Sequence, residues 1–288
     1  MADENVSVGD FTGRTVVVTG ANSGVGLAGA LGFARLGARV ALVGRDENRL
    51  AQAVAAVREL AGPDAEPAGY RCDFSVLDEV RALAERLGAA YPKIDVLANN
   101  AGAVGHQRVT TVDGHEQTIQ ANHLSPFLLT NLLRERLAGG RVVNTASDAH
   151  RSGRLDPADL ESNRHPYRAL RVYGSSKQAN ILFAAEAARR WPEILSFSYH
   201  PGVVRSNFGR DSAVYRFFYR FAPMLTTPEG GADTMLWLAG TPAAELTDGG
   251  YYVKRQLRRP SPPTGDAAFA AKLWEVSAAA VGLTPATA

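Results

Sequence analysis

The chain has 288 residues, with 31 Lys and Arg against 29 Asp and Glu, and its net charge of +2 gives no reason to expect a nucleic acid as partner. Hydrophobic residues make up 45% and charged residues 21%, the ordinary balance of a globular protein. No apolar run is long enough to span a bilayer, and the polar, acidic N-terminus is unlike a secretory signal. Cys72 is the only cysteine, which excludes a disulfide within the chain and fits the reducing cytoplasm.

A glycine-rich turn follows the first predicted strand, a β-branched run over 16–18. Gly20 allows a sharp reversal, Gly24 lets a pyrophosphate approach the backbone, and Gly26 lets the following helix, predicted over 27–36, pack against the strand. The N–H groups of the helix's first turn then form a phosphate site. A P-loop would carry Lys and Ser or Thr after the last glycine, and both are absent. The alternative is an ordinary turn between a strand and a helix.

The second predicted strand, 39–43, ends at Gly44 and Arg45. In a dinucleotide site this strand end meets the adenosine ribose, where a carboxylate would bind the 2′-hydroxyl of NAD and an Arg would pair with the 2′-phosphate of NADP. Arg45 therefore favours NADP(H) over NAD. The alternative is that Arg45 is a solvated loop charge and that Asp46 merely caps the helix predicted over 48–60.

Two further strands are predicted over 70–73 and 94–98. Asp73 and Phe74 follow the first of them, at the carboxyl end where ligands bind in open parallel sheets. An N-cap or turn Asp is the alternative for Asp73. The second strand closes with the tetrapeptide Asn-Asn-Ala-Gly, residues 99–102, and buried Asn side chains need hydrogen-bond partners. We expect them to tie neighbouring strands together.

A Tyr and a Lys share one face of a helix that follows the fifth predicted strand, 141–145. Ser147 comes directly after that strand, and a polar segment over 148–172 reads as a substrate-side loop. Tyr173 then opens the helix, and Lys177 lies four residues further on. A tyrosine has a pKa near ~10, too high for acid–base work at neutral pH, and a nearby ammonium lowers it. A chance pairing is the alternative.

The last part of the chain reads as a strand over 195–200, a helix over 229–239 and a strand over 251–253. The aromatic and basic run 215–225 suggests a substrate lid, with a membrane-surface helix or ordinary core packing as alternatives. The remaining expectations are helices over 77–87, 114–136 and 267–281, and a solvated basic segment over 254–259.

Taken in order, these motifs resemble the classical short-chain dehydrogenase/reductase family over roughly 14–252. Thr-Gly-Ala-Asn-Ser-Gly at the first turn and Ser-Lys-x-Ala-Asn after Tyr173 are similar to the branch of the retinol dehydrogenases and the WW-domain oxidoreductase. The resemblance implies a single Rossmann-type, doubly wound α/β domain with a seven-stranded, mainly parallel sheet flanked by helices. Its expected parts are the whole domain over 1–288, a core over about 14–253, a substrate lid over 203–227 and a C-terminal extension over 254–288.

The resemblance also implies four catalytic residues. Ser147 would hydrogen-bond the substrate oxygen, although the family usually has a second serine before it. Tyr173 would donate or accept the proton, and Lys177 would orient the cofactor ribose and lower the tyrosine pKa. Asn122 would bend its helix and anchor a water molecule near the lysine.

The remaining expectations concern ligands. The residues expected to bind the cofactor are Gly20, Asn22, Ser23, Gly24, Val25, Gly26, Arg45, Asp73, Phe74, Asn100, Ala101, Gly102, Tyr173, Lys177, Pro201, Gly202, Val203 and Ser206. The implied reaction is hydride transfer between NADP(H) and a carbonyl/alcohol pair on an apolar small molecule. A carbon–carbon double-bond reductase, a nucleotide sensor without catalysis and a membrane-surface scaffold are the alternatives. The histidines form no spaced cluster that suggests a metal, and a homo-oligomer is compatible with the chain.

Overall fold

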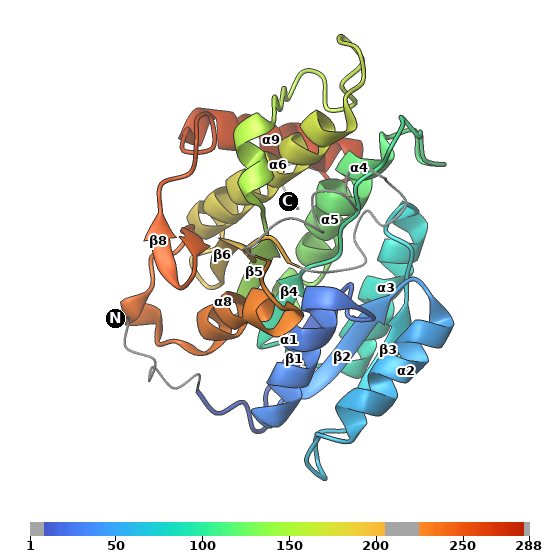
Figure 1. The fold of residues 1–288 in the computed structure, drawn as a ribbon, viewed down its shortest axis with the longest axis vertical. Helices are drawn as coiled ribbons and strands as arrows, with labels where there is room; N and C mark the ends of the chain where they lie inside the picture. The colour runs from blue at the N-terminus through green and yellow to red at the C-terminus, as the bar shows by residue number, and fades with distance from the viewer. Residues whose placement is uncertain (1–8, 205–224, 285–288) are drawn as a thin grey trace.

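A computed structural model of the protein describes residues 9–204 and 225–284, and every strand of that part belongs to one sheet (Figure 1). The strand order is β3-β2-β1-β4-β5-β6-β7-β8. The strands are β1 (Thr15–Thr19), β2 (Arg39–Gly44), β3 (Ala68–Arg71), β4 (Val96–Asn99), β5 (Arg141–Thr145), β6 (Leu195–His200), β7 (Tyr251–Val253) and β8 (Gln256–Arg258). All pairs are parallel except β7 with β8. The order reverses between β1 and β4, which makes the expected doubly wound sheet.

Helices cover both faces of the sheet (Figure 1). Side chains alternate along a strand, so Val16 and Val18 face one layer and Val17 the other. The first layer contains α1 (Gly24–Arg35), α2 (Glu47–Arg58) and α8 (Pro228–Gly240). The second contains α3 (Leu77–Ala90), α5 (Ser125–Leu132), α6 (Ala169–Arg190) and α9 (Ala267–Ala280), and the short α4 (Gln117–Ile119) precedes α5. Among the described residues, no helix is both long and apolar enough to cross a membrane.

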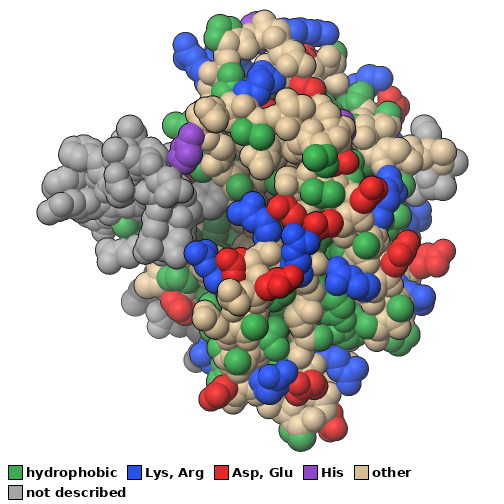
Figure 2. Space-filling view, turned by 90° about the vertical axis from the view of Figure 1, so that its right-hand side faces the viewer, with side chains coloured by type: hydrophobic (Ala, Val, Ile, Leu, Met, Phe, Trp, Pro, Cys, Tyr) green, Lys and Arg blue, Asp and Glu red, His purple; other side chains and the backbone are tan. Residues whose placement is uncertain are grey.

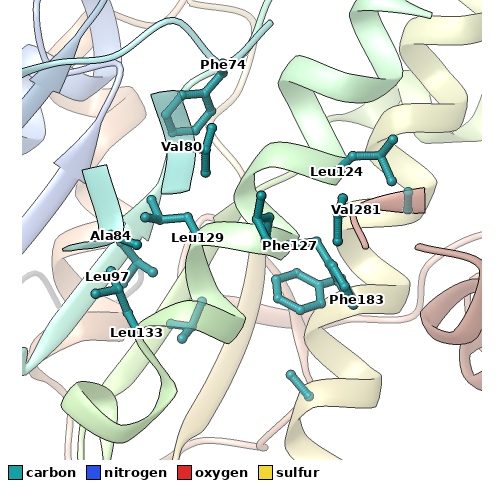
Figure 3. Packing of buried hydrophobic residues seen from close by; sticks show 14 of the residues in the cluster. Phe74, Val80, Ala84, Leu97, Leu124, Phe127, Leu129, Leu133, Phe183 and Val281 are labelled. Carbon is teal, nitrogen blue, oxygen red and sulfur yellow. The ribbon is translucent and has the colours of Figure 1, made fainter. Parts of the chain in front are cut away.

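The second layer has an aromatic core to which the C-terminal helix contributes. Phe127 of α5 and Phe183 of α6 face each other with ring centroids 5.4 Å apart (Figure 3). Trp274 of α9 lies 4.9 Å from Phe127 and 5.0 Å from Trp191, centroid to centroid. Such pairs add about 0.5–1.5 kcal/mol each beyond the area that they bury. Helix α9 is therefore an integral part of the core.

The sheet has eight strands where the sequence predicted seven. The segment 254–259 is largely exposed, as the sequence predicted, but its residues 256–258 form an unpredicted strand that pairs antiparallel with β7. Lys254 and Arg255 both adopt positive φ, 51° and 60°. Two such residues make the tight turn whose twist suits a β-hairpin, but the sequence lacks the Asn-Gly or Asp-Gly that usually signals it.

The predicted long helix over 114–136 is broken into pieces. Helix α4 is followed by a π-helical segment, Gln120–Leu124, and α5 ends at Leu132 before a 3₁₀ turn, Arg134–Leu137. Pro126 stands four residues after Asn122 and has no N–H to give to that carbonyl, which interrupts the α-helical pattern. The resemblance led us to expect the bend at Asn122, but the shorter helices were not predicted.

The predicted loop over 148–172 contains helical structure at both ends. Residues Asp148–Ser152 form a 3₁₀ helix capped by Ser147, whose Oγ accepts a hydrogen bond from the N–H of Ala149 at 3.2 Å. Helix α6 begins at Ala169, four residues before Tyr173, where the sequence predicts its start. The 3₁₀ helix and the first turn of α6 are short and have no apolar periodicity, so the sequence pattern did not reveal them.

One face of the molecule has interspersed charges of both signs (Figure 2). On the β3 side, Arg71 pairs with Glu79 at 2.8 Å and Arg58 with Glu66 at 2.8 Å. Exposed pairs of this kind are worth at most about 1 kcal/mol each. They leave no single-sign field on this face.

Candidate active site

A cleft of about 880 Å³ lies at the carboxyl ends of the parallel strands. It is lined by every residue expected to bind the cofactor except Ser206, which lies outside the described residues. Ser147, Tyr173 and Lys177 line the same cleft, and Asn122 does not. Pockets of a few hundred to 1,000 Å³ hold small molecules, so the cleft has room for a dinucleotide or a substrate beside part of one.

The first turn is shaped by glycines that no other residue could replace without a shift. Gly20 and Gly24 have φ of +65° and +54°. A Cβ on Gly26 would lie 2.2 Å from the carbonyl oxygen of Gly20, so strand and helix touch there through backbone alone. A Cβ on Gly102 would lie 3.4 Å from Lys177 Nζ and intrude on the cleft. The donor set and the bare backbone fit a pyrophosphate with its adjoining ribose.

Asparagines tie three strands together beneath this turn, as the sequence led us to expect. Asn99 Nδ2 donates to Asn144 Oδ1 of β5 at 3.0 Å and to Thr130 Oγ1 of α5 at 3.0 Å. Asn100 Nδ2 donates to the carbonyl oxygen of Thr19 in β1 at 3.0 Å, and Thr19 Oγ1 accepts from the N–H of Asn100 at 2.9 Å. Buried amides with these partners fix the relative position of the strand ends.

The end of the cleft beside β2 is charged and open to water. Arg45 has a side chain that is 70% exposed, with Nη1 3.9 Å from Asp73 Oδ2. Asp73 Oδ1 accepts from the N–H and Oγ of Ser75, so this carboxylate also closes a turn. Asp46 caps α2 by accepting from the N–H of Arg49 at 2.9 Å. Asp73 therefore closes a turn and Asp46 caps a helix, which are the structural alternatives stated for these two acids. The guanidinium of Arg45 still lines the cleft.

At the other end, Tyr173 and Lys177 project from α6 on one side. Lys177 Nζ lies 5.5 Å from the centroid of the Tyr173 ring. Lys177 is 3% exposed and donates to the carbonyl oxygen of Thr145 at 3.1 Å. Burial lowers the pKa of Lys177 to about 8. An ammonium at this position favours the phenolate form of the neighbouring tyrosine.

The side chain of Asn122 is bonded to the protein and not to the cleft. Its Oδ1 accepts from the N–H of Ala103 at 2.7 Å, and its Nδ2 donates to the carbonyl oxygen of Ala103 at 2.9 Å and to Ser176 Oγ at 3.0 Å. The amide thus joins the strand β4 exit to α6. Any water held near Lys177 by this residue would have to use its main-chain carbonyl.

Several cleft residues were not found from the sequence. Arg49 lies in the first turn of α2, four residues after Arg45, and its positive charge near that residue could have been noticed in the sequence. His200 was read only as a strand residue, and Thr145 only as the end of β5, yet both line the cleft. Leu170 lies in the first turn of α6, which the sequence did not predict to be helical, and His106 comes from an irregular segment.

Cys72 is buried, and burial raises the pKa of its thiol to about 12, so it acts as a small hydrophobe. Across 9–204 and 225–284, His, Cys, Asp and Glu side chains form no cluster of three or more that could hold a metal ion.

Comparisons with known proteins agree with this geometry. Residues 14–213 match the family model described as short chain dehydrogenase. The chain is 56% identical over 276 residues to a candidate daunorubicin C-13 ketoreductase from Streptomyces sp. (strain C5), covering 96% of this chain and 95% of that protein. It is 36% identical over 293 residues to retinol dehydrogenase 14 of Homo sapiens, covering 94% and 87%. Its fold is similar to that of a short chain dehydrogenase from Burkholderia cenocepacia J2315 in complex with NADP, with a TM-score of 0.69, 24% identity and coverage of 84% and 96%. This chain is therefore an oxidoreductase that belongs to the short-chain dehydrogenase/reductase family, in the branch of the retinol dehydrogenases.

Proposed function

We propose that this protein interconverts a carbonyl and an alcohol on an apolar small molecule with NADP(H), and that its working direction is reduction of a ketone. The observation that carries the proposal is the shared cleft. Ser147, Tyr173 and Lys177 meet the glycine turn there, with Lys177 Nζ 5.5 Å from the Tyr173 ring centroid. A dinucleotide cradle beside an acid–base pair is an arrangement for hydride transfer coupled to proton transfer.

Ser147 and Tyr173 would act on the substrate oxygen. Ser147 Oγ accepts from the N–H of Ala149, which leaves its own proton to donate to a carbonyl oxygen. The Tyr173 hydroxyl would give its proton to the same oxygen as the carbonyl carbon is reduced. When bound, NADPH supplies the hydride. The two hydroxyl groups would stabilise the negative charge that develops on the substrate oxygen, and Tyr173 would remain as the phenolate after it gives up its proton.

Lys177 would stabilise that phenolate. With a pKa near 8 it is mostly cationic at neutral pH, although burial has already weakened its hold on the proton. Only the ammonium form stabilises a negative charge on Tyr173. The side chain of Asn122 would help to position Lys177, because its amide bonds both Ala103 and Ser176, the residue before Lys177. The carbonyl of Asn122, which Pro126 cannot bond, would hold the water of a proton relay.

The proposed preference for NADP(H) rests on the charged end of the cleft. Arg45 and Arg49 both line it, and each can donate to a phosphate oxygen. Arg45 Nη1 lies 3.9 Å from Asp73 Oδ2. A 2′-phosphate would replace this carboxylate as the partner of the guanidinium. The NADP complex of the Burkholderia cenocepacia neighbour is compatible with this preference.

The proposed substrate class rests on the mouth of the cleft and on the relative from Streptomyces. Leu170 is 55% exposed and Val203 is 54% exposed, and both line the cleft, as does Val104. Apolar side chains left in water at a binding site favour an apolar ligand. We infer that the substrate is a polycyclic ketone of the kind named in that relative's description.

The test measures nicotinamide absorbance while the enzyme reduces daunorubicin or all-trans-retinaldehyde with NADPH or NADH. We expect daunorubicin with NADPH to give the highest kcat/KM, and NADH to be at least about tenfold poorer. NMR of the products identifies which carbon gained hydrogen. Reduction of a carbon–carbon bond of retinaldehyde, with its carbonyl intact, would replace the proposed function by the double-bond reductase. No oxidation of NADPH or NADH with either compound would refute both functions.

A further inference from the structure

Two histidines hold the peptide that follows the candidate catalytic serine. The carbonyl oxygen of Ser147 accepts a hydrogen bond from His150 Nδ1 at 2.7 Å. The N–H of the same peptide, which belongs to Asp148, donates to His200 Nδ1 at 3.3 Å. His150 is fully buried and His200 is 9% exposed. Two imidazoles from different elements thus hydrogen-bond one peptide unit, one at its oxygen and the other at its nitrogen. We call this pair of hydrogen bonds the grip.

The partners fix the tautomer of each ring. A carbonyl oxygen can only accept, so His150 carries a proton on Nδ1; its Nε2 accepts from the N–H of Ser261 at 3.2 Å and carries none. A backbone N–H can only donate, so Nδ1 of His200 carries no proton and the neutral ring is protonated on Nε2. That nitrogen lies 3.8 Å from Asp148 Oδ2. The two rings are therefore opposite tautomers, and both are neutral.

We propose that His150 and His200 are positioning residues that aim the hydroxyl of Ser147 by holding the Ser147–Asp148 peptide between them. The proposal rests on the proposed function of Ser147. Ser147 lies two residues after the end of β5 and caps the 3₁₀ helix. A rotation of the Ser147–Asp148 peptide would therefore move Oγ away from the substrate oxygen. A misplacement of about 1 Å can cost 100-fold in rate. His200 sits where β6 leaves the sheet, and Ser261 belongs to the segment after β8, so the grip draws on three elements.

The grip works only while both rings are neutral. A second proton on His200 would place a donor against the N–H of Asp148, and one on His150 would displace the N–H of Ser261. Burial lowers the pKa of both rings. Around His200, Asp148 opposes that shift, while His150 and Arg151 add to it. Around His150, Arg151 adds to it, Asp148 opposes it, and the Tyr251 ring packs at 5.2 Å between centroids. As the pH falls below the lowered pKa values, the grip loosens.

The test compares substitutions that keep or remove the gripping atom. Asn at position 200 puts Oδ1 where Nδ1 was, so His200→Asn keeps an acceptor that does not titrate, whereas His200→Leu has none. Asn at position 150 puts an amide donor at the Ser147 carbonyl, so His150→Asn keeps that bond and His150→Leu loses it. Gln52→Leu and Gln52→Asn are the controls, because Gln52 is exposed on α2 and lies outside the cleft.

We expect both Leu variants to lower kcat about tenfold or more. KM for NADPH should stay within about twofold of the wild-type value, because the hydrogen bonds of the two rings go to Ser147, Asp148 and Ser261, none of which is expected to bind the cofactor. We expect His200→Asn to recover kcat to within about threefold and to lose part of the acid limb of the pH–rate profile. The Gln52 variants should match the wild type. Equal kcat for His200→Leu and His200→Asn, or an unchanged acid limb in His200→Asn, would overturn the proposal.

A second readout does not depend on turnover. NMR of ¹⁵N-histidine-labelled protein reports the tautomer of each ring, and the Asn variants assign the two signals. We expect His150 protonated on Nδ1 and His200 on Nε2, with both rings titrating below the ordinary histidine pKa. If the wild type reduces no carbonyl but the tautomers are as stated, the proposed function fails and the grip stands. The reverse tautomer on either ring overturns the grip whatever the activity.

Discussion

The cleft has a cation at each end, and the two lie in opposite surroundings. Arg45 stands with 70% of its side chain in water, within 3.9 Å of Asp73. Lys177 is 3% exposed, and a carbonyl oxygen is the hydrogen-bond acceptor that the structure gives it. Water screens the first charge, so it costs the fold little and acts when a phosphate arrives. Burial raises the free energy of the second charge, which makes it available to stabilise an anion beside it.

The contrast shows how one binding site divides two tasks. The open end can select a ligand by charge without destabilising the chain. The closed end holds the buried charge of Lys177, which destabilises the fold. In the proposed reaction that charge stabilises the phenolate of Tyr173 beside it. The predictions below test this division, beginning with the largest effect.

Tyr173→Phe should lower kcat by about 10³-fold, because general acid catalysis contributes 10²–10⁴-fold and no other described hydroxyl shares the Lys177 face of α6. The Kd for NADPH, measured by fluorescence titration, should change less than about threefold. A variant that retains more than a tenth of the wild-type kcat would take Tyr173 out of the proton transfer. Loss of NADPH binding instead would mean that the phenol serves the cofactor.

Lys177→Met should abolish turnover and yet stabilise the fold at neutral pH. A pKa lowered from 10.5 to about 8 corresponds to a cost of up to about 3 kcal/mol for the buried charge. The cost is fully present below pH 8 and disappears as the pH rises toward 10.5, where the unfolded chain also loses its proton. Urea unfolding should therefore show a gain for the variant at pH 7 that shrinks by pH 10.

The control for this measurement is Lys272→Met, whose side chain is 63% exposed. It should change the free energy of unfolding by less than about 0.5 kcal/mol at either pH. If the Lys177→Met variant is less stable than the wild type at pH 7, the hydrogen bond from the ammonium to Thr145 stabilises the fold by more than the burial of the charge destabilises it.

Arg45→Ala should weaken NADPH binding by about 10- to 100-fold, the range of a hydrogen bond between charged groups, and leave NADH nearly unaffected. The NADPH Kd of the wild type should rise with salt more steeply than that of the variant, because the pair is exposed. Arg49→Ala should show the same selectivity with a smaller loss. Equal losses for the two cofactors would remove the 2′-phosphate from both guanidinium groups.

Gly26→Ala should lower stability by about 1–3 kcal/mol and weaken both cofactors alike, because its Cβ would meet the Gly20 oxygen at 2.2 Å and push strand from helix. Gly62→Ala is the matched control, since a Cβ there meets nothing within 4 Å. Thermal unfolding and titration with NADPH and NADH measure both effects. A loss for NADPH alone would mean that the turn, and not only the open end, selects the cofactor.

The sequence was most informative where backbone geometry restricts residue type. The glycine turn, the Asn pair and the Tyr–Lys spacing each have a local physical reason, and the strands that precede them lie where the sequence predicted them. The breaks around Asn122 and the turn at Lys254 were missed, because a π-helical segment and a non-glycine residue at positive φ are held by tertiary contacts. The roles of His150 and His200 could not be read either, since their shared peptide joins positions 50 residues apart only in the folded chain.

The eighth strand also bears on how the molecule behaves in a crowded solution. A parallel sheet that stopped at β7 would offer a row of unpaired amides to the next molecule. Strand β8 covers that row, and its own outer edge is only three residues long, ends in Arg258 and is closed soon after by Pro260. Short, charged, proline-bounded edges resist edge-to-edge aggregation. Variants that lengthen this hairpin with apolar residues should precipitate at lower concentration.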